Sequence, residues 1–351
     1  MFKNKKKISF KINKLIISNY VPPLIVPEIG INHSGNLETA FKIVDSAKKV
    51  GAKIIKHQTH IAEDEYSLEG RKIRPGNSKK NIFQIIKSTS LNEEEEYKLM
   101  LYVKKKKMEF ISTPFSFKAV DRLVKFNVPV FKVGSGEALN FPLLDYISKF
   151  RKKIIISSGM LSLNQLIKVI NFLKKRNVKM VIMHTTNLYP TPNKLIRLGA
   201  LTQMINYFNE NLIGFSDHSS NNLSSYGAIA LGASIIEKHF TDTKKRSGPD
   251  IKASIDEIQL KDLINNSKTI FEQRGGSKTN IKEEQVTRRF AYASIVSKRK
   301  ILKGEKLSKN NITVKRPGTG SFIAADFSSL LGKKVIKNIN ANIQIKKNQI
   351  K

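Results

Sequence analysis

Short apolar runs, rich in β-branched residues, alternate along this chain with longer stretches in which apolar residues recur at helical spacing. The short runs predict β-strands, and they are apolar throughout rather than at every second position. Continuous apolar runs are typical of strands that are covered on both faces, as in a parallel sheet. The predicted strands are residues 24–28, 53–58, 109–113, 130–133, 153–157, 179–184, 212–216 and 234–239.

The stretches with helical spacing predict crossover helices between these strands. They cover residues 37–50, 116–126, 163–176, 194–209 and 222–231, and a last helix is expected near 257–273. A strand and crossover unit that recurs in this way favours a (β/α)8 TIM barrel, with a doubly wound sheet as the alternative fold. The second connection, from Thr59 to about Leu91, is long and polar and contains RPGN, so we expect a loop over the barrel mouth rather than a helix.

The same pattern divides the 351 residues into four parts. Residues 1–20 form a basic N-terminal extension without an assigned role, and 21–275 form the barrel. The polar, glycine-rich segment RGGSKTN marks a linker, placed at 276–290. Residues 291–351 show short strands and turns without a long helix, and they predict a small β-rich domain.

Composition narrows the class of protein. Apolar residues make up 40% of the chain, which is enough for an ordinary core, and no apolar run is long enough to span a membrane. The lysines and asparagines near the start interrupt any signal-peptide core, and the chain has no cysteine. Disulfides, thiol catalysis and thiolate metal sites are therefore excluded, and we expect a cytoplasmic protein.

The charge balance is strongly basic, with 63 Lys and Arg against 28 Asp and Glu, a net charge of +35. A basic surface suggests a polyanion-binding barrel as the non-enzymatic hypothesis. However, nearly all the basic residues are lysines, spread along helices among many Ile and Asn residues. That distribution fits a bias toward AT-rich codons at least as well, so specific nucleic-acid binding is not our expectation.

A barrel places its reactive groups at the carboxyl ends of its strands. Polar side chains follow every predicted strand: Glu28; Lys56 and Gln58; Thr113; Lys132 and Ser135; Ser157 and Ser158; His184 and Asn187; Ser216 and His218; Lys238 and His239. The recurrence of such groups at eight strand ends favours one polar site at the mouth.

Two lysines of this set, Lys56 and Lys132, lie within apolar strands, where an unpaired charge is costly to bury. Together with Thr113, Ser135, Ser157 and Ser216, these lysines predict a binding site for a small anion that carries a phosphate and a carboxylate. The chain has no nucleotide-binding glycine motif, so the anion is not expected to be a nucleotide.

Two histidines end the last two strands, which are neighbours in a closed barrel. His218 and His239 could therefore share one divalent ion, and two nitrogen ligands leave positions open for water or substrate oxygen. Mn²⁺, Mg²⁺ or Co²⁺ would suit this role, with Mn²⁺ preferred. Asp217, in GFSDHS, could orient an imidazole or cap the following helix.

The chain contains a set of characteristic motifs: PEIGINHSGN, IKHQT, STPF, KVGSGE, SSGM, GFSDHS, EKHF, GPD and KRPGTG. With them the chain resembles bacterial sialic acid synthases, the N-acetylneuraminate synthase group, over about residues 22–345. The resemblance implies a TIM barrel joined to a C-terminal antifreeze-like (SAF) domain and a domain-swapped homodimer. It also implies condensation of phosphoenolpyruvate with N-acetylmannosamine or a related N-acyl hexose, giving a nine-carbon 2-keto acid and phosphate.

The resemblance also implies roles for individual residues. Phosphoenolpyruvate would be held by Lys56, Thr113, Lys132, Ser135, Ser157, Asn187 and Ser216. The sugar would be contacted by Gln58, Asn77, Tyr189, Asp250 and, from the small domain of the partner chain, Arg316. The catalytic set would comprise Glu28 and Glu137, which act on water or the sugar, and the metal ligands His218 and His239.

Two positions depart from the family pattern: His57, where an aromatic residue is usual, and Ile251, where His often follows Gly-Pro-Asp. We expect both to lie near the acceptor sugar. A legionaminic or pseudaminic acid synthase, or another enzyme that condenses phosphoenolpyruvate with a sugar, is therefore the alternative.

Overall fold

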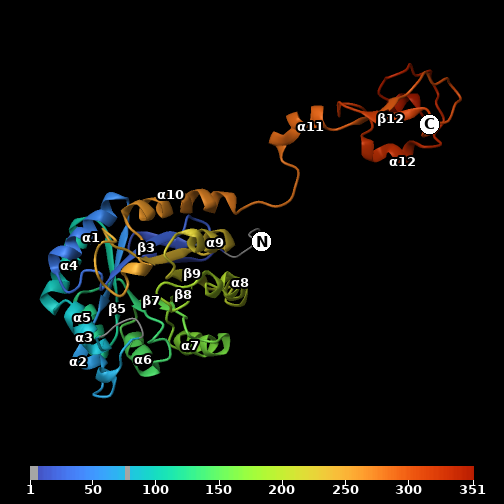
Figure 1. The fold of residues 1–351 in the computed structure, drawn as a ribbon. Coiled ribbons are helices and arrows are strands. Elements are labelled where there is room, and N and C mark those ends of the chain that lie inside the picture. The colour runs from blue at the N-terminus through green and yellow to red at the C-terminus, as the bar shows by residue number, and fades with distance from the viewer. Residues whose placement is uncertain (1–6, 76–79) are drawn as a thin grey trace. The chain divides into compact units, whose positions relative to one another are not determined.

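The computed structural model describes residues 7–75 and 80–351. Figure 1 shows the helices and strands along the chain. The chain divides into two compact units, with the boundary between Gly276 and Ser277. Each unit is described by itself.

The first unit is built on a closed parallel barrel, in the order β10-β3-β4-β5-β6-β7-β8-β9. Because β10 pairs with both β3 and β9, the sheet has no free edge. The TIM-barrel prediction is confirmed, and the doubly wound alternative is excluded. The strands are β3 Leu24–Gly30, β4 Ile54–Thr59, β5 Glu109–Pro114, β6 Val130–Val133, β7 Lys153–Ser157, β8 Met180–Thr185, β9 Leu212–Asp217 and β10 Ile235–His239.

Helices surround this barrel, and most lie where the apolar spacing predicts them. The predicted ones are α1 Leu37–Lys49, α5 Phe117–Lys125, α7 Leu163–Lys175, α8 Leu198–Tyr207, α9 Leu223–Leu231 and α10 Glu257–Gln273. The sequence analysis missed α4 Glu93–Lys105 and α6 Phe141–Lys149. Helix α4 begins with four glutamates and a capping box between Asn92 and Glu95, which stabilise a helix start without an apolar signal.

The connection after β4 is not the helix-free loop that its polar composition predicts. It contains α2 Ala62–Glu65, a 3₁₀ turn at Gly70–Lys72 and α3 Ile82–Thr89. Helix α3 starts at a capping box between Asn81 and Gln84 and buries Ile85 and Ile86. The apolar residues of IFQII therefore form a short amphipathic helix, which the surrounding polar residues conceal in the sequence.

The barrel interior has an apolar lower part and a polar upper part. The strands contribute to the lower part the side chains Val26, Ile54, Ile111, Val130, Ile155, Val181, Met183, Leu212 and Ile235. Two residues further along, several strands carry a polar side chain on the same face, because side chains in a strand alternate between faces. Val26 is thus followed by Glu28, Ile54 by Lys56 and Val130 by Lys132.

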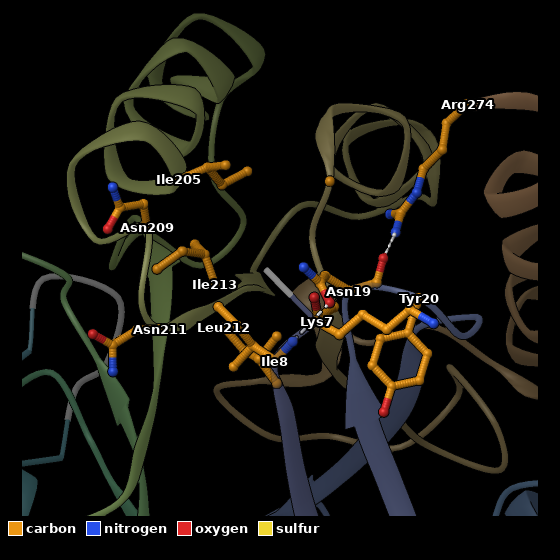
Figure 2. Close-up of a pocket in the computed structure, with 12 residues that line it drawn as sticks. Lys7, Ile8, Asn19, Tyr20, Ile205, Asn209, Asn211, Leu212, Ile213 and Arg274 are labelled. Atoms are coloured by element: carbon orange, nitrogen blue, oxygen red, sulfur yellow. Dashed lines mark hydrogen bonds between the residues drawn. The ribbon is translucent and has the colours of Figure 1, made fainter. Parts of the chain in front are cut away.

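The described part of the N-terminal extension closes the lower end of the barrel. Strands β1 Ser9–Ile12 and β2 Leu15–Ser18 form an antiparallel hairpin, and Phe10, Ile12 and Ile17 pack against the apolar interior layer. Beside the hairpin lies a pocket that Figure 2 shows, where Arg274 donates a hydrogen bond to the Asn19 carbonyl and Asn19 accepts one from the Ile8 N–H. The extension therefore has a structural role that its sequence does not reveal.

The second unit has a separate core of short elements. It contains η4 Lys282–Glu284, α11 Gln285–Ala291, the antiparallel pair β11 Ser294–Ser297 and β12 Ile312–Lys315, and α12 Phe327–Leu330. Its core residues are Ile295, Ile301, Leu307, Ile312, Leu330, Val335, Ile339 and Ile345. The prediction of a small β-rich fold without a long helix is confirmed. In the described part of the chain, no helix has the length and apolar character that a membrane span requires.

Candidate active site

A cavity of about 120 Å³ opens at the carboxyl ends of the barrel strands. Most of the residues predicted from the strand ends and the motifs line it together. They are Glu28, Lys56, Gln58, Thr113, Lys132, Ser135, Ser157, Asn187, Tyr189, Ser216, His218 and His239.

The two lysines of the cavity are buried and are paired with carboxylates of the chain itself. Lys56 Nζ lies 2.6 Å from Glu28 Oε1 and 3.2 Å from Glu237 Oε1. Lys132 Nζ lies 3.6 Å from the same Glu237 oxygen and donates to Ser157 Oγ at 2.6 Å. Two cations and two carboxylates thus balance each other. The lysines therefore do not need a bound anion for neutralisation, although the sequence suggested that they would.

The two lysines differ in how firmly they hold their protons. Burial lowers the pKa of Lys132 to about 8, and the charge of Lys56 adds to this effect. Burial also disfavours the charge on Lys56, but Glu237 and Glu28 outweigh it and raise the Lys56 pKa. Burial opposes ionisation of Glu28, yet Lys56 and His239 hold its pKa below the usual value. Glu28 and Lys56 are therefore a stable ion pair, while Lys132 is the group that can lose its charge.

Several buried polar atoms in the cavity wall have no hydrogen-bond partner within the described residues. They are Thr113 Oγ1, Asn187 Oδ1 and His239 Nδ1. Such atoms are costly to bury unless a ligand or water satisfies them. Next to them Gly159 donates its N–H to Ser135 Oγ, and a Cβ at Gly159 would lie 2.2 Å from Asn187 Oδ1. Only glycine leaves room for this approach, so the SSGM motif shapes the cavity.

The two predicted metal ligands lie side by side. The rings of His218 and His239 are 5.4 Å apart between centroids, and the Tyr189 ring stacks on His218 at 4.2 Å. His218 Nδ1 is 2.9 Å from the Thr186 carbonyl, which can only accept, so this nitrogen carries the proton and Nε2 keeps its lone pair. Burial and His239 lower the His218 pKa to about 3, so the imidazole is neutral.

The donor set near these rings is small. Glu28 Oε2 lies 3.7 Å from His239 Nε2, and Asp250 Oδ2 lies 3.8 Å from His239 Nδ1. No group of three or more His, Asp or Glu side chains is arranged as a metal site in the described ranges. The two adjacent imidazoles, with His239 Nδ1 unsatisfied, nevertheless suit a divalent ion whose other ligands are water or substrate.

The remaining predicted residues lie beyond the cavity lining. Asp250 reaches His239, as described above, and Glu137 follows β6, where Asn140 donates to it at 2.7 Å. Burial raises the Glu137 pKa. Arg316 belongs to the second unit, and Asn77 lies outside the described residues.

Asp217 faces outward from the barrel, away from the cavity. It accepts hydrogen bonds from the Ser219 N–H and from the Ser224 and Ser225 hydroxyls, and it lies 3.0 Å from Lys238 Nζ. Its hydrogen bonds to Ser224 and Ser225 therefore fix the start of α9, and its ion pair with Lys238 links β9 to β10. This pair fixes the backbone from which His218 and His239 project on the opposite face.

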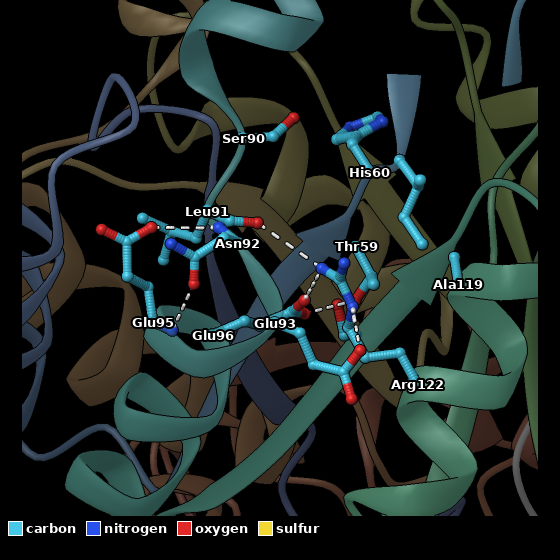
Figure 3. Close-up of polar contacts among 12 residues, drawn as sticks. Thr59, His60, Ser90, Leu91, Asn92, Glu93, Glu95, Glu96, Ala119 and Arg122 are labelled. Atoms are coloured by element: carbon cyan, nitrogen blue, oxygen red, sulfur yellow. Dashed lines mark hydrogen bonds and ion pairs between the residues drawn. The ribbon is translucent and has the colours of Figure 1, made fainter. Parts of the chain in front are cut away.

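His57 also faces outward, which corrects the expectation that it lies near the acceptor. His57 Nδ1 lies 3.1 Å from Glu96 Oε1, between β4 and α4. Figure 3 shows the same carboxylate with Arg122, which donates to it at 2.9 Å, and with the Thr59 hydroxyl. Because side chains alternate along a strand, Lys56 and Gln58 face the cavity while His57 and Thr59 face the helices. Ile251 is likewise buried in a 3₁₀ turn, outside the cavity lining.

Sequence reasoning missed Glu237, Phe115 and Thr185, which line the cavity. Glu237 could have been found, because it lies two residues before His239 on β10 and so shares its face. Thr185 is the last residue of β8 and Phe115 directly follows β5, so both also lie at strand ends, where the sequence alone does not separate them from their neighbours.

A closed parallel barrel with a polar, ion-paired cavity at the carboxyl ends of its strands is the arrangement typical of (β/α)8-barrel enzymes that act on small polar molecules. The family models identify the particular group: the NeuB family matches residues 43–279, and the SAF domain matches 292–351. The chain belongs to the NeuB family, and its second unit is a SAF domain.

Individual relatives agree with this assignment. The chain is 36% identical to the N,N'-diacetyllegionaminic acid synthase of Campylobacter jejuni over 90% of this chain and 96% of that protein. It is 30% identical to human N-acetylneuraminate-9-phosphate synthase over 91% and 90% of the two chains. The N-acetylneuraminic acid synthetase of Leptospira borgpetersenii superposes with a TM-score of 0.74 at 26% identity, over 81% of this chain and 96% of that structure. The expected membership of the sialic acid synthase family is confirmed.

Proposed function

We propose that this protein condenses phosphoenolpyruvate with the open-chain aldehyde of an N-acyl hexosamine, forming a nine-carbon 2-keto acid and phosphate. The observation that carries the proposal is the buried cavity, where two lysines and several hydroxyls surround the unsatisfied atoms Thr113 Oγ1, Asn187 Oδ1 and His239 Nδ1. In the reaction, C3 of phosphoenolpyruvate bonds to the aldehyde carbon, water adds at C2, and phosphate leaves with cleavage of its C–O bond.

Phosphoenolpyruvate would bind on the side of the cavity formed by β4 to β9. Lys56, Lys132, Ser135 and Ser157 would hold its negative charges through charge-assisted hydrogen bonds. Thr113, Asn187 and Ser216 would complete the cradle. Ser216 Oγ donates to Glu237 Oε1 at 3.1 Å, so a bound anion would compete with Glu237 for both lysines and this hydroxyl.

The two carboxylates of the proposed catalytic set suit different tasks. Glu28 is held ionised by Lys56, so it would orient its neighbours and stabilise positive charge that develops at C2 of phosphoenolpyruvate. The pKa of Glu137 is raised by burial, which makes it the better group to exchange a proton with water or sugar. Gln58, Tyr189 and Asp250 would contact the acceptor, together with Asn77.

His218 and His239 would hold a divalent ion, with Mn²⁺ the preferred candidate and Mg²⁺ or Co²⁺ the alternatives. Their imidazoles are closely spaced and that of His218 is neutral, which fits such an ion. When bound, the ion would act as a Lewis acid for the acceptor aldehyde. The chain contributes the orientation: Thr186 fixes the His218 tautomer and Tyr189 packs against both rings.

The acceptor is the six-carbon N-acyl hexosamine from which a sialic, legionaminic or pseudaminic acid is built. The relatives in the previous section include synthases of a legionaminic acid and of a phosphorylated sialic acid, so the six-carbon precursors of such acids form the substrate panel. We further propose a cytoplasmic location and a homodimer in which Arg316 of one chain reaches the barrel of the other.

A coupled assay tests this function. The full-length protein with phosphoenolpyruvate, Mn²⁺ and each acceptor in turn should release phosphate and a 2-keto acid whose mass is the sum expected for condensation. Silence with every acceptor would contradict the proposal.

Removal of one imidazole tests the metal ligands. The His218→Ala variant should have the circular dichroism spectrum of the wild type. Its Mn²⁺-dependent turnover should be at least about a hundredfold lower than that of the wild type, since an imidazole ligand is lost. Ser220→Ala, at the exposed position two residues further along, is the matched control and should keep its activity. Full Mn²⁺-dependent activity in His218→Ala would contradict the ligand assignment.

A further inference from the structure

A hydrogen-bonded chain connects helix α2 to the interior of the barrel through His60, a residue that has no role in the function proposed above. His60 Nδ1 lies 2.9 Å from Glu65 Oε2, and His60 Nε2 lies 3.1 Å from Gln58 Oε1. The Gln58 amide nitrogen donates to Glu28 Oε1 at 2.7 Å. Figure 3 places His60 beside Thr59, at the end of β4.

The chemistry of the groups fixes where the protons lie in this chain. The buried Glu28 is paired with Lys56 at 2.6 Å and accepts from Gln58, so the Gln58 nitrogen faces Glu28 and the Gln58 oxygen faces His60. His60 Nε2 must therefore carry a proton. At the other end Glu65 accepts the Ile61 N–H through Oε1 at 2.7 Å and faces His60 Nδ1 with Oε2 at 2.9 Å, so as an acceptor it requires a proton on Nδ1 as well. Both ring nitrogens are then donors, which describes the imidazolium cation.

The surroundings of His60 support a positive charge. The ring stacks on Phe115 at 4.2 Å with an angle of 11° between the planes, and Glu65 lies beside it. From the other elements packed nearby, Asp250 interacts electrostatically with His60, and so does His33. Burial lowers the His33 pKa to about 3, so His33 is neutral and does not oppose the cation.

Loss of the His60 proton would break the chain at one of its ends. If Nε2 kept the remaining proton, a lone pair would face the Glu65 carboxylate. If Nδ1 kept it, a lone pair would face Gln58 Oε1, and the amide would be free to turn its oxygen toward Glu28. In both cases Gln58 would no longer be fixed against Glu28, which also binds Lys56.

We propose that His60, as an imidazolium held by Glu65, is a positioning residue that orients the Gln58 amide and through it the Glu28 carboxylate for the condensation. This inference rests on the proposed function for its effect on turnover. The charge state of His60 can be tested independently of turnover.

The first experiment measures that charge state directly. Long-range ¹⁵N–¹H NMR spectra of the full-length protein resolve the protonation of each ring nitrogen, and six histidines give a tractable spectrum. His60→Gln assigns the His60 signals by their disappearance. At pH 7 we expect both His60 nitrogens to be protonated; a neutral ring would overturn the proposal, whether or not the protein condenses any sugar.

The second experiment measures turnover against pH. In Glu65→Gln the amide oxygen can still accept from Nδ1, but the negative charge that holds the proton is lost. The alkaline fall in kcat should therefore move to lower pH than in the wild type, since the carboxylate that favours the protonated ring is gone. Turnover at low pH should recover toward the wild-type value, because a higher proton concentration restores the second ring proton.

Glu63→Gln is the matched control, because Glu63 lies on the same helix but pairs with Lys87 at the surface. It should leave both the pH profile and the rate unchanged. A uniform loss of activity in Glu65→Gln at every pH, or no change at all, would overturn the positioning role. Silence of the wild type with every acceptor would instead count against the proposed function, and the NMR result would still decide the charge of His60.

Discussion

The two lysines inside the barrel share the carboxylates Glu28 and Glu237, but they do not share them equally. Lys56 contacts both, whereas Lys132 reaches only Glu237, at 3.6 Å, and otherwise bonds Ser157 and the Val133 carbonyl. The less compensated lysine is the one whose pKa burial lowers to about 8. The site therefore has one permanent cation and one whose charge depends on pH.

This difference predicts a pH dependence for anion binding. An anionic substrate favours protonated Lys132, so the free protein must take up a proton once the pH exceeds about 8. Affinity for phosphoenolpyruvate should then fall by up to about tenfold per pH unit. Between pH 7 and pH 8 it should fall by only about twofold, because at least half of Lys132 is still protonated and the phosphate is already largely ionised. Isothermal titration calorimetry at pH 7 and pH 9, in buffers of different ionisation enthalpy, measures both the affinity and the proton uptake.

Lys132→Arg provides the control, since arginine keeps its charge throughout this range. Its affinity, whatever its absolute value, should be the same at pH 7 and pH 9. Equal wild-type affinities at the two values would show that Lys132 does not titrate near 8.

At the scale of elements, the strand alternation separates the reactive residues from the structural ones. Along β9, the residue after it and β10, the side chains of Ser216, His218, Glu237 and His239 line the cavity, while Asp217 and Lys238 pair on the outside. On β4 the same alternation gives Lys56 and Gln58 to the cavity and His57 to the Glu96 cluster.

The N-terminal hairpin is the other element with a defined task, because it covers apolar residues that water would otherwise reach. Ile17 is fully buried against the barrel interior, and its neighbour Ile16 is 45% exposed. Ile17→Ala should lower the free energy of unfolding by about 2–5 kcal/mol, the range for truncating a buried isoleucine. Denaturant unfolding followed by circular dichroism measures it.

Ile16→Ala is the matched control on the same strand and should change stability by less than about 0.5 kcal/mol. Because the hairpin lies at the end of the barrel away from the cavity, neither variant should alter KM for phosphoenolpyruvate under conditions where the protein is folded. A loss for Ile17→Ala no larger than that for Ile16→Ala would contradict the closure role.

At the scale of the whole molecule, the chain comprises a barrel and a SAF domain, each with its own core. The proposed function requires Arg316, from the second unit, to act at the barrel of a partner chain. A homodimer is therefore part of the proposed function, and the mass of the protein measured by sedimentation should be twice that of one chain.

Subunit mixing tests the exchange itself. His218→Ala and Arg316→Ala should each be nearly inactive, but a heterodimer would contain one site with both residues intact. Equal mixing should restore about a quarter of the wild-type activity, because half of the dimers are then mixed and each has one complete site. Absence of any recovery, with dimers confirmed by sedimentation, would place Arg316 at the barrel of its own chain.

The sequence by itself determined the fold class and most of the cavity. Eight continuous apolar runs require strands covered on both faces, and a polar group after each run marks the end where a barrel has its site. Specific motifs such as GFSDHS and EKHF then identified the family. These features are local, because they depend on residues close together in the chain.

The tertiary structure alone decided which groups meet. Glu237 pairs with Lys56 and Lys132, Gln58 bridges Glu28 and His60, and His57 turns away from the cavity toward Glu96, across strands and helices far apart in the sequence. It also gave the N-terminal hairpin its place in the barrel. Ion pairing and burial depend on distances in space between residues, and the spacing of apolar residues along the chain does not determine these distances.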